Sequence, residues 1–385
     1  MTSGFATDPD VVADQAALVA AAWSPADAPE SWQLTAAQFT TLGDDRELLA
    51  IAAEIEPDRL PPLLFSAAAT FLVLESDREP LRDWFPRVGE PQRPLGAGFR
   101  DAYRDFCLDR RDRLLELCAT HRYQMNEVGR CAHVLPAMAP AIAADREMAL
   151  VDVGTGAGLA LHLDRYRYQF RHPDGRVTTV GDPESRVEIS TELRGAQPLP
   201  IPSRLPCVSE RIGIDVEPLE LQDADVRAWI AACLPQEIGA VTRFHHAVEV
   251  AMSHDSRLVR GDACTALPAA LASIPEDRLV CLVDTFVHVF FPDAELRRFR
   301  ELVEDLGTRR DLDWISLDPL IPMGHAATSS VIGVAPPADV VERNRVGGVF
   351  GVLGVISYRD GARSARLLAI AHPGAAWVQG LDQRL

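Results

Sequence analysis

The run Ala149-Leu150-Val151-Asp152-Val153-Gly154-Thr155-Gly156-Ala157-Gly158 decides the fold of this chain. Its first half is short and apolar, which is typical of a buried strand, and its second half places a glycine at every other position. Glycine lets the backbone approach a ligand closely, and a helix beginning near Leu159 would add free N–H groups beside it. The sequence therefore predicts a strand, a ligand-binding turn and a helix in that order.

The spacing of the glycines narrows the choice of ligand. A dinucleotide-binding turn needs small residues at its first, third and sixth positions, and the sixth position here is Leu159. This disfavours a nicotinamide oxidoreductase. A phosphate-binding loop needs a lysine, and this chain has none, so that all 38 basic residues are arginine. A nucleoside without a pyrophosphate group fits the turn better, and the alternative is a glycine turn that binds nothing.

Further strand-like runs alternate with amphipathic helices after residue 148. The runs cover residues 212–216, 279–284 and 312–317, and the helices cover 223–233, 242–252 and 293–306. This alternation predicts an α/β fold with a Rossmann-like, doubly wound sheet. Near the end of the chain, Asp360-Gly361 separates two β-rich runs, which predicts an antiparallel C-terminal hairpin.

We expect two regions along the chain. Residues 1–145 repeat apolar residues at intervals of three and four without a β pattern, which predicts an all-helical N-terminal region. Residues 146–385 would form the domain that contains the sheet. Within it, residues 163–207 combine alternating aromatic residues with several prolines, which predicts an inserted aromatic β-ribbon too long for a simple connection.

Composition disfavours several classes of protein. The net charge of −18 argues against a nucleic-acid partner. The seven cysteines include no C-x-x-C pair and the histidines lack metal-binding spacing, so we expect neither disulfides nor a metal site. No uncharged apolar run reaches the roughly 18 residues of a membrane helix, and the acidic N-terminus is unlike a signal peptide. We therefore expect a cytoplasmic protein without a membrane partner.

Four motifs in order resemble those of class I S-adenosylmethionine-dependent methyltransferases. They are residues 152–158, 213–218, 260–263 and 283–293. The resemblance implies S-adenosyl-L-methionine as cofactor, with the glycine turn around its methionyl part, Asp215 on the ribose hydroxyls and Asp262 on the adenine. The cofactor-binding residues that it implies are Asp152, Gly154, Thr155, Gly156, Gly158, Asp215, Val216, Asp262, Ala263, Asp284 and Thr285.

The spacing before the ribose-binding acid departs from the usual pattern. Asp215 follows Asp152 by 63 positions, whereas this acid usually comes about 20 residues after the glycines. The inserted ribbon accounts for the excess, and if the ribbon lay elsewhere, Asp164 or Asp182 would be the ribose ligand. The whole chain also resembles an uncharacterised actinobacterial family of methyltransferase-like proteins, through residues 126–130, 161–166 and 181–183.

A few further residues are candidates for acceptor chemistry. His288 follows the run at 279–284, where such sheets bind substrates, and it could act as a general base or serve only in packing. Asn126 and Glu127 share a helix face with Arg130 and could grip a carboxylate or form an exposed capping cluster. Arg165 and Tyr166 could line the substrate entrance or pack the inserted ribbon on the domain.

Taken together, these features predict a methyltransferase for a small molecule, which would be methylated at the oxygen of a hydroxyl or carboxylate. The helical region would form a lid or substrate-binding cap, and it could also carry a homodimer surface. The alternative is a methyltransferase-fold protein that binds a nucleoside or a partner without catalysis.

Overall fold

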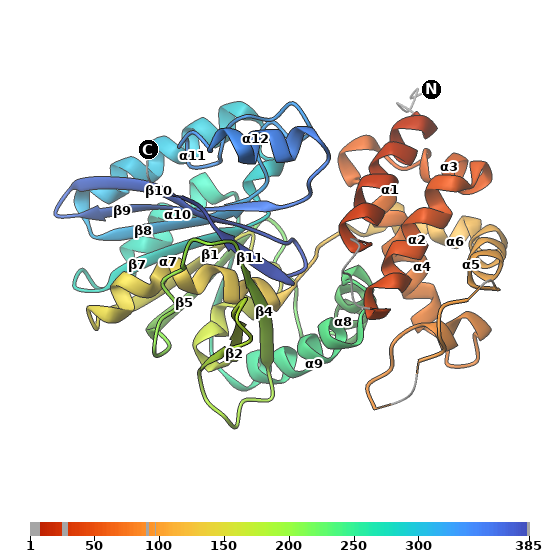
Figure 1. Cartoon of the computed structure of the whole chain (residues 1–385), viewed down its shortest axis with the longest axis horizontal. Helices are drawn as coiled ribbons and strands as arrows, with labels where there is room; N and C mark the ends of the chain where they lie inside the picture. Colours follow the sequence, from red (N-terminus) through yellow and green to blue (C-terminus); the bar gives the residue numbers. More distant parts are fainter. Residues whose placement is uncertain (1–7, 25–29, 90–91, 97, 383–385) are drawn as a thin grey trace. The chain divides into compact units, whose positions relative to one another are not determined.

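The computed structural model describes residues 8–24, 30–89, 92–96 and 98–382. The chain divides into two compact units, and Figure 1 labels most of their α-helices and strands. The helical unit comprises Met1–Asn126 and Leu221–Phe244, and the sheet unit comprises Glu127–Glu220 and His245–Leu385. Each unit has a hydrophobic core of its own, and each is described separately.

The described elements of the helical unit are α-helices and 3-10 helices. They are α1 (Pro9–Trp23), η1 (Glu30–Trp32), α2 (Gln33–Asp44), α3 (Arg46–Ala52), η2 (Pro57–Arg59), α4 (Pro61–Leu74), η3 (Pro80–Trp84), α5 (Gly98–Asp109), α6 (Arg111–Thr120) and α8 (Ala224–Cys233). Helix α3 begins after Asp45, whose carboxylate accepts hydrogen bonds from the N–H groups of Glu47 and Leu48. Helix α4 is apolar on nearly all sides, and its side chains form much of this unit's core.

The border between the units differs from the expected one at residue 145. Residues 127–145, which include helix α7 (Cys131–Ala143), belong to the sheet unit. Helix α8, expected to cover the sheet, packs on α4 instead, where Trp229 lies against Phe71 and His121. Helix α9 (Ile238–Ser253) begins in the helical unit and ends in the sheet unit. Helical periodicity identifies the apolar face of a helix but not the hydrophobic core on which that face packs. The sequence therefore did not show to which unit these helices belong.

Eleven strands within the described residues form one mixed sheet, in the order β3-β2-β4-β11-β10-β9-β8-β7-β1-β5-β6. Their bounds are β1 (Glu147–Val153), β2 (Arg167–Arg171), β3 (Val177–Val180), β4 (Glu188–Arg194), β5 (Cys207–Asp215), β6 (Arg257–Arg260), β7 (Leu279–Thr285), β8 (Leu312–Asp318), β9 (Gly351–Arg359), β10 (Ala362–Ala371) and β11 (Trp377–Gly380).

The strand order reverses at β1. Strands β5 and β6 lie on one side of β1, and β7 and β8, which come later in the chain, lie on its other side. These five strands are parallel, so their carboxyl ends lie along one edge, which we call the carboxyl edge. Asp152 is in register with Gly213 of β5 and Val283 of β7, so the residues that follow these three strands lie close together. Open α/β sheets bind ligands at such a reversal.

Helices of the sheet unit cover the sheet and connect its strands. They are η4 (Val128–Arg130), α7, η5 (Leu159–Arg165), α10 (Ala263–Ala272), η6 (His288–Phe290), α11 (Asp293–Arg309) and α12 (Ala338–Arg345). Helix α10 connects β6 to β7 and α11 connects β7 to β8. Both bury apolar side chains in the core, among them Leu267 of α10 and Phe299 of α11.

The C-terminal hairpin and the inserted segment extend the same sheet. Strands β9 and β10 pair antiparallel around Asp360 and Gly361, which both have positive φ, as the Asp-Gly turn predicts. Strand β10 pairs with β11, and β11 pairs in parallel with β4 of the insertion. The strands within residues 163–207 therefore continue the main sheet, and Tyr168 and Phe170 are buried on it.

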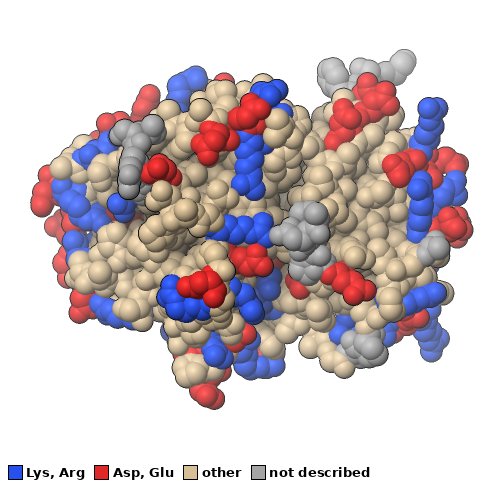
Figure 2. All heavy atoms as spheres, in the orientation of Figure 1, with Lys and Arg blue, Asp and Glu red and all other residues tan. Residues whose placement is uncertain are grey.

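Charged side chains of both signs are interspersed on the face that Figure 2 shows, and neither sign forms a broad field there. In the part of the chain that the structure describes, every helix is too short or too polar to span a bilayer.

Candidate functional site

The glycine turn lies at the carboxyl end of β1, where the strand order reverses. Gly154, Gly156 and Gly158 have φ angles of 70°, 55° and 75°, which are left-handed values that favour glycine. Gly154 also packs closely on Val287, because a Cβ atom at residue 154 would lie 2.3 Å from Val287 Cγ2. The turn therefore requires glycine both for its conformation and for the close approach of its neighbour.

The segment after the turn differs from the expected helix. It is the 3-10 helix η5, seven residues long, with non-helical angles at His162. Such a short segment lacks the aligned peptide dipoles that make a long helix N-terminus attractive to anions. Ligand binding at this turn would therefore rest on the backbone of residues 154–158 and on neighbouring side chains.

Asp215, at the end of β5, faces the glycine turn. Its Oδ2 accepts a hydrogen bond from the N–H of Gly156 at 2.9 Å, and its Oδ1 accepts one from the N–H of Glu217 at 2.9 Å. The residue is 8% exposed. Each carboxylate oxygen can accept more than one hydrogen bond, so Asp215 can still accept from the hydroxyls of a vicinal diol.

The two alternative ribose-binding acids are engaged elsewhere. Both carboxylate oxygens of Asp164 accept hydrogen bonds from Arg211 at 2.7 Å, in a pair that is largely buried. Asp182 accepts from the N–H of Glu184 within a turn of the inserted segment. Asp215 is therefore the acid that lies beside the glycine turn, because the insertion separates β1 from β5 in sequence but not in the sheet.

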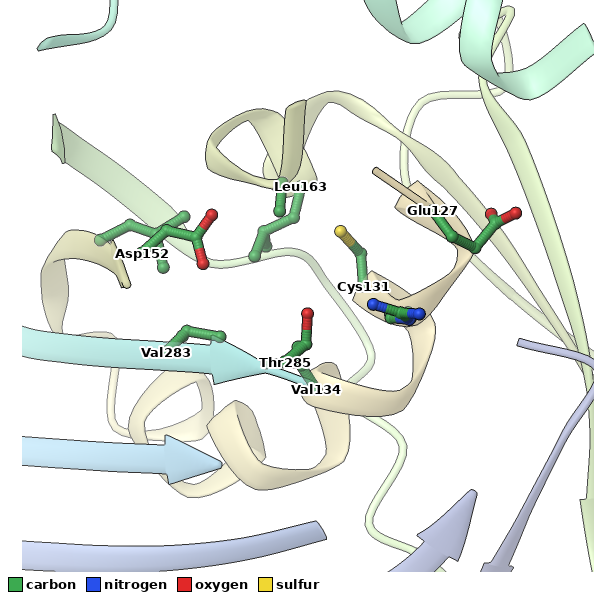
Figure 3. Close-up of a pocket in the computed structure, with 10 residues that line it drawn as sticks. Glu127, Cys131, Val134, Asp152, Leu163, Val283 and Thr285 are labelled. Atoms are coloured by element: carbon green, nitrogen blue, oxygen red, sulfur yellow. The ribbon is translucent and has the colours of Figure 1, made fainter. Parts of the chain in front are cut away.

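A cavity of about 30 Å³ adjoins the turn within the sheet unit. Figure 3 shows the Asp152 carboxylate, the Cys131 sulfur and the Thr285 hydroxyl pointing toward one space. The residues that line the cavity are Glu127, Arg130, Cys131, Val134, Leu150, Asp152, Ala160, Leu163, Val283 and Thr285. This volume suits one or two water molecules, so any larger ligand would extend beyond it, along the carboxyl edge.

Asp152 is the buried acid of this cavity. Burial raises its pKa to about 7, the nearby Thr155 hydroxyl lowers it, and the charges of Asp284 and Asp215 raise it further. At neutral pH the carboxyl group therefore exists in both protonation states. It can donate a hydrogen bond to a ligand or accept one from it.

Glu127 and Arg130 line the same cavity, although Glu127 precedes the 3-10 helix η4 and so does not share a helix face with Arg130. The Oε1 of Glu127 accepts from the N–H of Gly129 at 2.7 Å, and Figure 3 shows its carboxylate on the side away from Asp152. The Nε of Arg130 donates to the backbone oxygen of Pro373 at 2.9 Å, and its guanidinium carbon lies 4.3 Å from the ring centre of Phe286. Glu127 caps η4, as the alternative had it, but both residues are buried rather than exposed.

His288 and Asp284 lie in a buried cluster beneath the carboxyl edge. Neither side chain is exposed, and His288 Nε2 lies 3.2 Å from Asp284 Oδ2. The imidazole packs against Phe299 and Trp314. Burial alone would raise the pKa of Asp284, but the charge of His288 and hydrogen bonds bring it below its usual range. A general base must touch its substrate, so the geometry favours the packing role of His288.

Asp318, at the end of β8, completes this cluster. It accepts hydrogen bonds from the N–H groups of His288 and Val289 at 3.3 and 3.2 Å. Burial, together with the charge of Asp284, raises the pKa of Asp318 well above its usual range. The pKa values of the two carboxyl groups are therefore shifted in opposite directions. The effect of the cluster is to fix the loop after β7 against the end of β8.

Several other predicted residues lie away from the cavity. Asp262 caps helix α10, where its Oδ1 accepts from the N–H and the hydroxyl of Thr265, and Ala263 is buried in the first turn of that helix. Thr155 lies within the glycine turn and is buried. Val216, directly after Asp215, is exposed at the carboxyl edge.

Tyr166 is fully buried, and its hydroxyl donates to the backbone oxygen of Leu159 at 2.6 Å. It therefore packs the inserted segment on the sheet unit, which was the alternative to lining a substrate entrance. Arg165 is exposed beside it and is outside the cavity lining. Asn126 falls in the helical unit, where its Nδ2 donates to the backbone oxygen of Gln124.

The sequence analysis missed Cys131 and Val134 of the cavity and Asp318 of the buried cluster. Cys131 and Val134 follow Glu127 by four and seven residues, so extending the helical spacing would have found them. Asp318 is the last residue of the largely apolar strand β8. This position, at the carboxyl end of a strand, is the sequence signal that could have identified it. Among the described residues, no three His, Cys, Asp or Glu side chains gather to hold a metal ion.

One protein family matches nearly the whole chain. The model of a family described as "Uncharacterized protein conserved in bacteria (DUF2332)" matches residues 18–379. The chain belongs to that family. The match includes described parts of both the helical unit and the sheet unit, so the two units occur together in the family. No curated protein matches the chain. The family description states no reaction.

Proposed function

We propose that this protein is an S-adenosyl-L-methionine-dependent methyltransferase that acts on a small molecule at an oxygen atom. The pairing of the glycine turn with Asp215, at the reversal of the strand order, carries the proposal. The order β6-β5-β1-β7-β8 supports a Rossmann-like, doubly wound sheet, and such sheets bind nucleotides at their switch point.

The residues of the site suit the parts of this cofactor. Asp215 has acceptor capacity left for the ribose hydroxyls, and the positive φ angles of the three glycines hold the turn beside it. Asp152 and Arg130 line one cavity and carry the charges that an ammonium and a carboxylate would need. The nucleoside itself would lie outside the 30 Å³ cavity, along the carboxyl edge.

The acceptor oxygen belongs to a carboxylate or to a hydroxyl. When bound, the cofactor would supply an electrophilic methyl group, which an ionised carboxylate could accept without losing a proton. A hydroxyl would need a base. His288 is enclosed, whereas Asp152 lines the cavity and burial raises its pKa to about 7, so Asp152 is the group that could take this proton. The residues of the chain would bind and orient the two reactants and exclude water.

A second candidate is a protein of the same fold that binds the nucleoside without catalysis. Two observations favour it, namely the enclosure of His288 and the small volume of the cavity. It shares the cofactor site with the first candidate and differs in having no turnover.

Calorimetric titration with S-adenosylmethionine and with S-adenosylhomocysteine tests the site. We expect micromolar binding to the unmodified protein and at least tenfold weaker binding to Asp215→Asn. Glu217→Gln is the matched control, because Glu217 is exposed next to Asp215 and contributes its backbone N–H to the site rather than its side chain. No binding at millimolar concentration would refute both candidates, whereas binding without transfer of a labelled methyl group to any small carboxylic acid or alcohol would favour the second.

A further inference from the structure

A second cavity lies in the helical unit. Its volume is about 290 Å³, against about 30 Å³ for the cavity beside the glycine turn. Small-molecule sites in proteins begin at about 300 Å³, so this cavity has room for one small ligand. The residues that line it all belong to the helical unit, and they include Glu30, Ser31, Leu34, Trp84, Arg93 and Leu95.

One wall of this cavity, formed by residues 92–95, is fixed on η3. The N–H of Arg93 donates to the backbone oxygen of Asp83 at 2.9 Å, and Nε2 of Gln92 donates to the backbone oxygen of Trp84 at 2.6 Å. The guanidinium carbon of Arg93 lies 3.9 Å from the ring centre of Trp84, and that indole packs in turn on Phe99. The position of the guanidinium is therefore set before any ligand binds.

Two opposite charges line this cavity without being paired. Glu30 and Arg93 both belong to the lining, yet neither has an ion-pair partner in the part of the chain that the structure describes. The guanidinium of Arg93 contacts an aromatic ring, so its N–H donors remain for a ligand. An arginine pairs well with a carboxylate, and a glutamate pairs with an ammonium. A ligand that carries both groups would therefore neutralise both side chains.

The remaining lining provides an apolar contact and one buried donor. Leu34 is 3% exposed, Trp84 is 5% exposed and Leu95 is partly buried. The indole N–H of Trp84 is buried and has no acceptor among the described residues, and a buried donor in this state is costly. Since Arg93 lies over the same indole, a carboxylate bound to Arg93 would lie beside this donor.

We propose that this cavity binds an α-amino acid with an apolar side chain. Arg93 pairs with the carboxylate of the ligand, Glu30 pairs with its ammonium group, and Leu34 and Leu95 contact its side chain. The inference goes beyond the proposed function and does not depend on it, because no residue of the glycine turn takes part.

Calorimetry on the full chain with L-leucine and three analogues tests this site. 4-Methylpentanoate is leucine without the ammonium group, 3-methylbutylamine is leucine without the carboxylate, and glycine lacks the apolar side chain. We expect leucine to bind at least tenfold more tightly than each analogue, because each analogue leaves one part of the lining without its partner.

Two variants separate the charges. Arg93→Gln should weaken leucine binding at least tenfold and leave the affinity for 3-methylbutylamine unchanged. Glu30→Gln should weaken leucine binding as much and leave the affinity for 4-methylpentanoate unchanged. Arg46→Gln and Glu56→Gln are the matched controls, because both side chains are exposed in the helical unit and lie outside the cavity lining. Both should bind leucine as the parent does.

No binding of leucine at millimolar concentration would overturn the inference. Equal affinities for leucine and the two single-charge analogues would also overturn it, as would an equal loss of leucine affinity in the control variants. S-adenosylhomocysteine has an amino-acid end of its own, so it is titrated into Arg93→Gln as well. We expect unchanged affinity there, and a tenfold loss would mean that the cavity binds the nucleoside instead. Leucine binding without any binding of S-adenosylhomocysteine would refute the proposed function alone.

Discussion

The backbone N–H of Gly156 donates a 2.9 Å hydrogen bond to Oδ2 of Asp215, a residue 59 positions further along the chain. The bond joins the turn after β1 to the end of the adjacent strand β5. It fixes the turn in the left-handed conformation of its glycines and places a carboxylate beside them. The candidate site is therefore held together by the same contact that would position its ligand.

Replacing Asp215 by Asn should destabilise the protein. An amide has one acceptor oxygen, so it cannot accept from both Gly156 and Glu217 as the carboxylate does. We expect the free energy of unfolding to fall by roughly 1.5–3 kcal/mol, as for a hydrogen bond to a charged group. Urea titration measures the change, and a variant as stable as the parent would show that these bonds contribute little.

Gly154→Ala should cost more stability than an alanine at another glycine with positive φ. Gly175, in the turn between β2 and β3, has a φ of 83° and open space around it, so Gly175→Ala should cost about 1 kcal/mol from strain alone. Gly154→Ala adds a clash with Val287 and should cost roughly 2–4 kcal/mol. A second change, Val287→Ala, should recover part of the loss. Equal losses at the two glycines would contradict the packing argument.

Asp152→Asn should change how stability depends on pH. The pKa of Asp152 is about 7 in the folded protein, whereas an unfolded aspartate ionises near 3.9. Between these values the unfolded state binds fewer protons than the folded state, so stability falls as pH rises. As the pH rises from 5 to 8, the free energy of unfolding of the parent should therefore fall by about 2–3 kcal/mol relative to that of the variant.

Urea titrations of both proteins at the two pH values measure this difference. Asp174→Asn is the control, because Asp174 is exposed in a turn and its variant should follow the parent at both pH values. A gap between the parent and Asp152→Asn that stays constant with pH would mean that Asp152 does not titrate in this range.

His288→Leu should strongly destabilise the protein, by about 3–5 kcal/mol, because it leaves Asp284 as a buried charge without its imidazole partner. Adding Asp284→Asn should restore part of the stability by removing that charge, and the double variant should still bind the nucleoside. Chemical denaturation and calorimetry provide the two measurements. If the double variant is less stable than the single one, the two side chains do not act as a pair.

Tyr166→Phe removes one buried hydroxyl and its hydrogen bond to Leu159. We expect a loss of about 1 kcal/mol in the free energy of unfolding, with unchanged affinity for S-adenosylhomocysteine. A weakened affinity for S-adenosylhomocysteine at unchanged stability would return Tyr166 to the ligand site.

Local sequence signals predict the strands that build the site but not how the whole sheet is assembled. Strands β1 and β7 contain continuous apolar runs, β5 and β8 contain shorter or interrupted ones, and the Asp360-Gly361 turn indicates the β9–β10 hairpin. Strands β6 and β11 have four residues each and were missed, because so short a segment shows hardly any periodicity. That β11 joins β4 depends on pairing between distant residues, which no local pattern records.

Some features of the candidate site could likewise be predicted from the sequence, and others could not. The approach of Asp215 to Gly156 follows from strand order and could be predicted. The enclosure of His288 could not, since a histidine after a strand has the same sequence pattern whether it faces solvent or Phe299. Which residues gather around Asp152 depends on where α7 packs on the sheet, and its contacts with β4, β8 and β9 are tertiary contacts that helical spacing does not reveal.

Strand β11 also affects how the chain can be made. It lies between β10 and β4 in the sheet, yet the ribosome produces β2, β3 and β4 long before it. At common rates of translation the delay is roughly ten to forty seconds, during which β4 has an open edge that other chains could pair with. Protection of the nascent polypeptide by a chaperone over this interval would therefore raise the yield of native molecules.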